Sequence, residues 1–114
     1  MKLMVIILKH EQLLDQVTSI LLEAGLYDAS VLDGENIETL ADASMPLLSS
    51  FKSLFGDEFS YNRTIICPVR YTEAIRDVLD IFNQEGIDFT DPETGVFFTL
   101  PCSIFTGDNV EELL

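Results

Sequence analysis

The sequence predicts an α+β domain of the ferredoxin-like class: β-α-β-β-α-β, with a four-stranded antiparallel sheet and two helices on one face. Four short apolar runs alternate with two amphipathic segments in that order, and two split β-α-β units define this class. The two halves of the chain show the same pattern. Each predicted helix ends in a similar glycine turn, Glu-Ala-Gly-Leu at 23–26 and Gln-Glu-Gly-Ile at 84–87. With 114 residues the chain has room for one domain.

The first half begins with residues 2–8, a short run rich in Val and Ile that is typical of a strand. From Gln12 the apolar spacing becomes helical, and Gly25 supplies a stop. The segment from Tyr27 to Leu32 predicts the second strand, ended by the turn signal Asp-Gly at 33–34. The residues expected to face inward from the helix are Leu13, Leu14, Val17, Ile20, Leu21 and Ala24.

The second half repeats this plan. A third strand is expected over 63–69, with 61 as an alternative start. Thr72 is predicted to cap a helix that runs to about residue 85, where Gly86 ends it. The fourth strand is expected over 96–100 and is ended by Pro101. The residues expected to face inward from this second helix are Ile75, Val78, Leu79 and Phe82.

The strands are apolar on both faces, although a sheet with one face in water should alternate apolar and polar residues. Burial of one such side chain contributes roughly 1.5–3 kcal/mol, so a bare apolar face is costly and marks an interface. We therefore expect a homo-oligomer whose sheets pack through their helix-free faces. The pattern sets Leu3, Val5 and Ile7 against Met4, Ile6 and Leu8; Ile65, Cys67 and Val69 against Ile66; and Val96, Phe98 and Leu100 against Phe97.

The charge balance limits the classes of partner. The chain has 20 acidic and 6 basic residues, a formal net charge of -14, which disfavours nucleic acid and anionic membranes because both are held mainly by Lys and Arg. Charged residues from Lys9 interrupt the apolar N-terminal run, and no run approaches the ~20 residues that span a bilayer. We expect a cytoplasmic protein without membrane insertion.

No arrangement of residues predicts catalysis or a metal centre. The only histidine, His10, lies at a strand-to-helix junction, and no glycine-rich nucleotide loop is present. Cys67 and Cys102 lack metal-ligand spacing, and we expect buried thiols in a reducing compartment, with a single disulfide between them as the alternative. The chain is therefore expected to be no enzyme, with no catalytic or metal-ligating residues.

Residues 34–60 form a connection of unusual length for so small a domain, and such loops tend to carry function. An apolar group within it is predicted to anchor a protein partner, since aliphatic and aromatic side chains dominate interfaces. The alternative is that the same side chains pack within the loop or on a neighbouring subunit. The group consists of Leu47, Leu48, Phe51, Leu54 and Phe55.

Two turns are candidates for holding a small ligand through backbone amides: residues 33–36 (Asp-Gly-Glu-Asn) and 91–95 (Asp-Pro-Glu-Thr-Gly). Glycine allows close approach of a ligand, and consecutive N–H groups form anion-binding concavities. The alternative is that both glycines serve tight turns only.

Several stretches together resemble the nitrogen regulatory PII-like proteins: residues 23–32 (EAGLYDASVL), the long segment after them, the strand at 62–66 (NRTII), and 94–101 (TGVFFTLP). The resemblance covers roughly residues 2–101. Its most specific part is the ending Thr-Gly-hydrophobic-Phe-x-x-x-Pro. The resemblance implies a ferredoxin-like homotrimer that binds adenine nucleotides in clefts between subunits and engages transporters or regulatory enzymes through a long T-loop, here 34–60.

The family's B-loop would match residues 91–95, and its basic residues have no counterpart there or in 102–114. Phosphates placed at this loop would need compensation from Arg63, Lys52, Mg²⁺ or backbone amides. The tentative ligand-binding residues are Asp33, Gly34, Glu35, Arg63, Asp91, Thr94 and Gly95.

The expected organisation is a PII-like domain over 1–102, followed by an acidic tail over 103–114. The expected function is signalling: a small effector, such as an adenine nucleotide, at the subunit clefts and a protein partner at 34–60. The alternative is a metal-binding or metal-tolerance trimer of the same fold, motivated by the excess of carboxylates, His10 and the two thiols.

Overall fold

A computed structural model describes residues 1–35, 37 and 62–107 of the protein. The described elements are β1 (Lys2–Leu8), α1 (Gln12–Glu23), β2 (Ser30–Asp33), β3 (Arg63–Val69), α4 (Thr72–Gln84) and β4 (Gly95–Pro101). The predicted partner-binding group at 47–55 and most of the predicted acidic tail lie outside the described residues. Neither described helix has the length and apolar character needed to cross a membrane.

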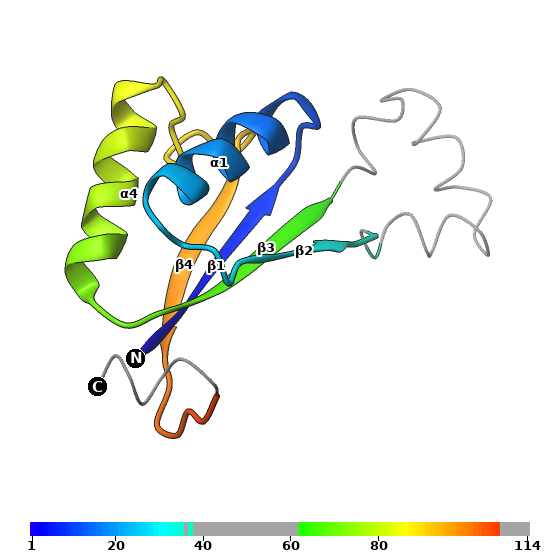
Figure 1. Ribbon diagram of the computed structural model, residues 1–114. Coiled ribbons are helices and arrows are strands. Elements are labelled where there is room, and N and C mark those ends of the chain that lie inside the picture. Colours follow the sequence, from blue (N-terminus) through cyan, green and yellow to red (C-terminus); the bar gives the residue numbers. More distant parts are fainter. Residues whose placement is uncertain (36, 38–61, 108–114) are drawn as a thin grey trace.

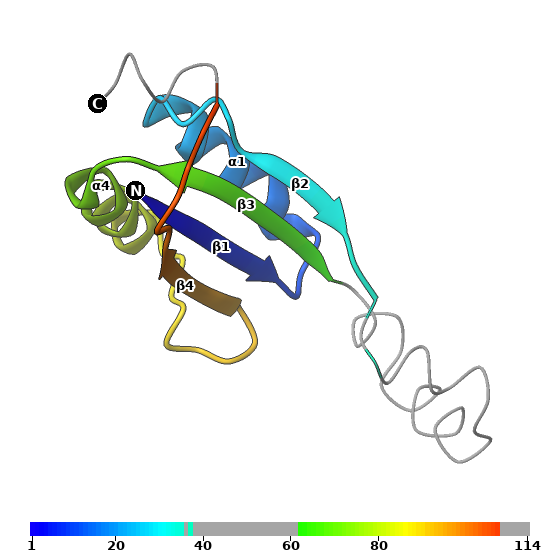
Figure 2. The ribbon, with the colours of Figure 1, turned by 90° about the horizontal axis from the view of Figure 1, so that it is seen from below.

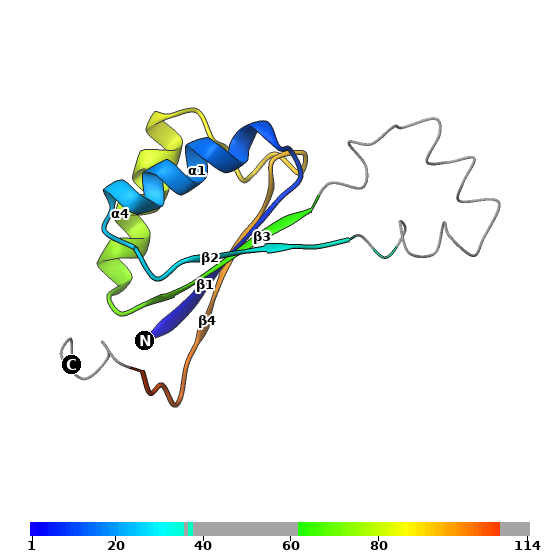
Figure 3. The same ribbon diagram turned by 45° about the vertical axis from the view of Figure 1, so that its right-hand side comes forward.

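The strands form one antiparallel sheet in the order β2-β3-β1-β4. Figure 2 shows the four strands side by side in this order, and Figures 1 and 3 show both helices on the same side of the sheet. The antiparallel sheet with both helices on one face was predicted from the sequence. Each helix returns the chain across one intervening strand, so the opposite face is left uncovered.

The core lies between the sheet and the helices. One parity of β1 and β3 points into it, and the inward faces of α1 and α4 cover it. Phe82 on α4 meets Phe97 on β4 edge to face, with ring centroids 6.2 Å apart, and Phe89 packs against both rings at 5.5 and 5.7 Å. The largest fully buried side chains are Phe82, Met4, Ile6, Leu8, Leu21, Ile65, Val17, Val78 and Cys67.

The helix-free face of the sheet is apolar across three strands, as predicted. The register places Val5 between Ile66 and Phe98, and Val5 is buried by its neighbours. Toward the β4 edge the face is open, since Val96, Phe98 and Leu100 are 38–49% exposed. We call this surface, formed by Leu3, Val5, Ile7, Ile66, Val96, Phe98 and Leu100, the bare sheet face.

Three details of the predicted elements were wrong. β2 begins at Ser30 rather than Tyr27, because the chain needs residues 27–29 to pass from the end of α1 to the sheet, and Tyr27 is 75% exposed. Thr72 is the first residue of α4 and makes no capping bond, since the extended Tyr71 precedes the helix. β4 includes Gly95 and Pro101, and Pro101 is tolerated because β4 is an edge strand.

Candidate functional site

The strand register brings the two predicted ligand-binding turns to one end of the sheet. Asp33 on β2 pairs with Arg63 on β3, Arg63 with Leu8 on β1, and Leu8 with Gly95 on β4. These four residues form one row, and we call this the loop end of the sheet. Because neighbouring strands lie ~4.8 Å apart, the backbones of Asp33 and Gly95, which are three strand spacings apart, are separated by roughly 14 Å. A ligand of nucleotide size could span both turns.

The base of the β2–β3 hairpin is held by polar contacts. The Arg63 guanidinium donates to the Asp33 carboxylate, and the Gly34 N–H donates to the Asn62 carbonyl oxygen at 2.9 Å. The Thr64 hydroxyl donates to the Asn62 side-chain oxygen at 3.3 Å. The Asp33 side chain is 77% exposed, so this ion pair contributes less than about 1 kcal/mol to stability. The ion pair lies beside the Gly34–Asn62 hydrogen bond, where the chain leaves the sheet.

The loop before β4 is folded around its own carboxylates. The Thr90 N–H and hydroxyl donate to the Asp88 carboxylate at 2.9 and 2.6 Å, and these bonds hold the pKa of Asp88 below its usual value. The Glu93 N–H donates to the Asp91 carboxylate at 2.9 Å, and the Thr94 N–H donates to the Asp91 carbonyl oxygen at 3.1 Å. In this conformation these amides already have acceptors inside the loop.

Lys9, just beyond β1, ties the same loop to the sheet. Its Nζ donates to the Pro92 carbonyl oxygen at 2.9 Å, and its backbone N–H donates to the Thr94 carbonyl oxygen at 3.3 Å. Sequence reasoning gave Lys9 no role at this site. The tertiary structure gives the reason, because antiparallel pairing of β1 with β4 places the residue after β1 beside the loop that precedes β4.

Gly95 has a structural reason to be glycine. Its φ is +139°, and a Cβ at this position would overlap the Ile7 carbonyl oxygen. β1 and β4 approach closely here, and only glycine fits the conformation without pushing them apart. The turn therefore requires Gly95 whether or not a ligand binds beside it.

The charged groups at the loop end are not arranged to bind a highly charged anion. Lys9 and Arg63 are the cations that the described contacts place there, and both donate to groups of the chain itself. The two turns carry four exposed carboxylates, Asp33, Glu35, Asp91 and Glu93, and Asp33 is the one that pairs with Arg63 in the described contacts. Such a site suits a polar ligand of low negative charge better than a triphosphate, because unpaired like charges repel strongly at short range.

Both cysteines are free thiols, but only Cys67 is buried as expected, whereas Cys102 is half-buried. Cys67 is fully buried in the core, where burial and then the nearby Asp28 carboxylate raise the pKa of its thiol to about 11. It is therefore protonated and inert at neutral pH. Across the part of the chain that the structure describes, no group of three or more His, Cys, Asp or Glu side chains could hold a metal ion, so no observation favours the metal-binding alternative.

Comparisons with known proteins identify the fold. No protein-family model matches the chain, and no curated protein matches it. Among solved structures, it is similar to the apo form of CPII from Thiomonas intermedia K12, described as a nitrogen regulatory PII-like protein. The TM-score is 0.55 and the identity 19%, over 87% of this chain and 85% of that one.

A second solved structure gives the same result. The chain is similar to Arabidopsis thaliana PII bound to citrate, with a TM-score of 0.53 and 20% identity over 90% of this chain and 77% of that one. Both likenesses extend over nearly the whole chain, as did the resemblance found in the sequence. The chain therefore has the ferredoxin-like fold of the nitrogen regulatory PII-like proteins.

Proposed function

We propose that this protein is a homotrimeric, cytoplasmic PII-like regulator. In this proposal it binds a small effector at the loop end of the sheet and a protein partner through residues 34–60. The observation that carries the proposal is the bare sheet face, combined with a PII-like fold. An apolar surface across three strands needs a cover, and a symmetric assembly of copies of this chain would supply it. No catalytic step is assigned.

The effector site is proposed to include Asp33, Gly34, Glu35, Arg63, Asp91, Thr94 and Gly95. The register supports this grouping, since it places both turns at one end of the sheet. The surrounding carboxylates favour an adenine nucleotide with few phosphates over ATP, because each added phosphate brings further negative charge toward them.

A thermal-shift panel of adenosine, AMP, ADP and ATP without Mg²⁺ tests this effector class. AMP is expected to raise the Tm more than ATP does, and a ligand at 100 times its Kd adds roughly 2.7 kcal/mol of stability. Arg63→Gln should reduce the shift, whereas Arg76→Gln on α4, away from the loop end, should leave it unchanged. A largest shift with ATP, or equal shifts in both variants, would contradict the proposed site.

The partner is proposed to bind through residues 34–60, with Leu47, Leu48, Phe51, Leu54 and Phe55 as its anchor. The described ends of this segment leave the sheet side by side, since the Gly34 N–H donates to the Asn62 carbonyl oxygen. The hairpin base can therefore close without the residues between. A membrane transporter or a regulatory enzyme is the proposed kind of partner.

Deletion of residues 38–58 tests the role of the segment. The shortened protein is expected to keep its oligomeric mass by sedimentation, because the bare sheet face is untouched, and to lose the partners that the full chain captures from its native host. Captured proteins are identified by mass spectrometry in both preparations. Collapse of the assembly, or an unchanged set of captured proteins, would show that the segment has another role.

A further inference from the structure

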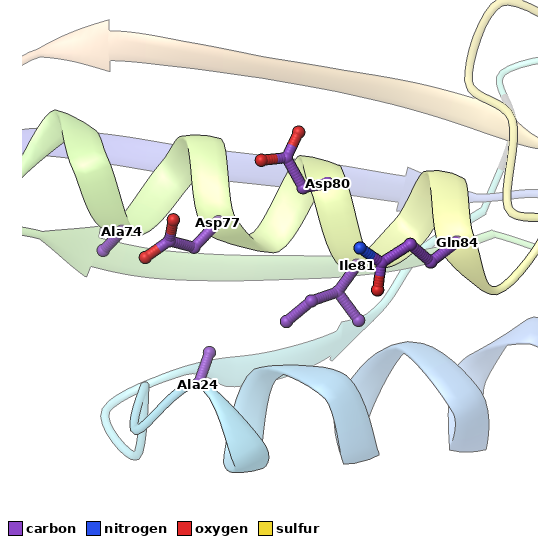
Figure 4. Close-up of a pocket in the computed structure, with 6 residues that line it drawn as sticks. All are labelled: Ala24, Ala74, Asp77, Asp80, Ile81 and Gln84. Carbon is purple, nitrogen blue, oxygen red and sulfur yellow. The ribbon is translucent and has the colours of Figure 1, made fainter.

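A groove lies between the two helices, on the side of the molecule opposite the bare sheet face. It has a volume of about 440 Å³ and is lined by Ala24, Ala74, Asp77, Asp80, Ile81 and Gln84. Figure 4 shows Ala24, at the C-terminal end of α1, and Ile81 of α4 directed toward each other, with the strands behind the helices. Assembly through the bare sheet face would leave this groove open to solvent.

The floor of the groove is apolar. Ala24, Ala74 and Ile81 are half-buried and pack against the core, and the short side chains of the two alanines leave space that larger side chains would fill. The Gln16 side-chain amide donates to the Glu85 carbonyl oxygen at 3.4 Å, which joins α1 to the C-terminal end of α4. The groove therefore presents an apolar strip between two helices that are joined at one end.

The rim of the groove is acidic. Glu73, Asp77, Asp80 and Gln84 are spaced i, i+4, i+7 and i+11, so they form one stripe along α4. Arg76 is the one basic residue within the spans of α1 and α4, which together carry five carboxylates. The net charge of the two helices is therefore negative, with the stripe on α4 as its main contributor.

We propose that this groove docks a basic amphipathic helix of a partner protein. Apolar side chains on one face of such a helix would fill the strip over Ala24, Ala74 and Ile81, while its lysines and arginines would meet the stripe on α4. The 13 residues of α4 extend ~20 Å, which matches almost four turns of a partner helix.

Charge argues against an occupant from the chain itself. Acidic residues outnumber basic ones in 38–61 and in 108–114, and a second copy carries the same net charge of -14. Each of these two segments, and a second copy of the chain, would bring negative charge to the acidic rim, and this repulsion disfavours docking. The proposed surface is thus independent of residues 34–60 and of the oligomer interface.

The probe is a fluorescein-labelled synthetic peptide of about 18 residues, with leucines at helical i, i+3, i+4, i+7 spacing and lysines elsewhere. Saturable binding to the full-length protein is expected, and it should weaken as salt is added. Asp77→Asn with Asp80→Asn should weaken binding by about tenfold, whereas Glu93→Gln at the loop end should have little effect. Amide NMR shifts should concentrate at Ala24, Ala74 and Ile81.

A charge-reversal variant adds a gain of binding to the test, so the result does not depend only on a loss of binding. The variant Asp77→Lys with Asp80→Lys should reject the lysine peptide and bind a version in which glutamate replaces lysine. Equal binding of a scrambled peptide of the same composition would overturn the proposal, because attraction to the acidic chain as a whole would then explain it. NMR shifts on β1 and β4, or a change in oligomeric mass of the Asp77→Asn, Asp80→Asn variant, would also overturn it.

Discussion

Replacement of Gly95 by alanine is expected to remove a large part of the stability of the domain. The new Cβ would overlap the Ile7 carbonyl oxygen, so β1 and β4 would have to separate at the point where they pair. A left-handed conformation costs an L-residue about 1–2 kcal/mol, and with the displaced strand the loss should reach about 3 kcal/mol or more. Domains of this size have only about 5–15 kcal/mol in total. Urea unfolding followed by circular dichroism measures the difference.

Gly86 provides the matched control. Its φ of +79° is also positive, but a Cβ there would meet nothing within 4 Å. Gly86→Ala should therefore lower the free energy of unfolding only by the cost of a positive φ for alanine, about 1 kcal/mol. If the two variants lose the same free energy of unfolding, the close approach of β1 and β4 is not what requires Gly95.

Phe98→Asp is expected to break the proposed trimer into monomers. Phe98 lies on the bare sheet face beside Val5, at the open β4 edge. The substitution would remove an apolar contact worth roughly 1.5–3 kcal/mol from each subunit and would place a carboxylate in the interface. Sedimentation at micromolar concentration should show a change from about three times 12.8 kDa to 12.8 kDa.

Leu22→Asp tests whether any exposed apolar residue has this effect. Leu22 is 55% exposed and belongs to α1, on the helix side of the molecule. This variant should keep the mass of the wild-type assembly. A wild-type protein that sediments as a folded monomer would refute the proposed assembly, and an unchanged mass for Phe98→Asp would show that subunits meet through another surface.

Local patterns predicted most of the fold. Residues 2–8 had the length and composition of a strand, and the helical spacing from Gln12 stopped at Gly25, which takes a positive φ as helix-ending glycines do. The second strand was placed three residues too early at its start. Tyr27 has strand propensity, but propensity carries no information on where a neighbouring strand begins to pair.

The candidate site could be predicted only in part. The two turns were visible as Asp-Gly and Asp-Pro-Glu-Thr-Gly, yet the sequence showed no reason to connect either with Lys9. The hydrogen bond from Lys9 Nζ to the Pro92 carbonyl joins residues 83 positions apart. Such a contact arises from strand pairing and has no local signal.

The sequence by itself determined the types and order of the elements and the apolar character of both sheet faces, because these follow from residue periodicity. Only the tertiary structure decided that Asp33, Arg63, Leu8 and Gly95 share one row, that Gly95 must be glycine, and that a groove with acidic residues at its rim lies between α1 and α4. Register and helix placement are set by contacts between residues distant in the chain, and these form only when the whole core packs.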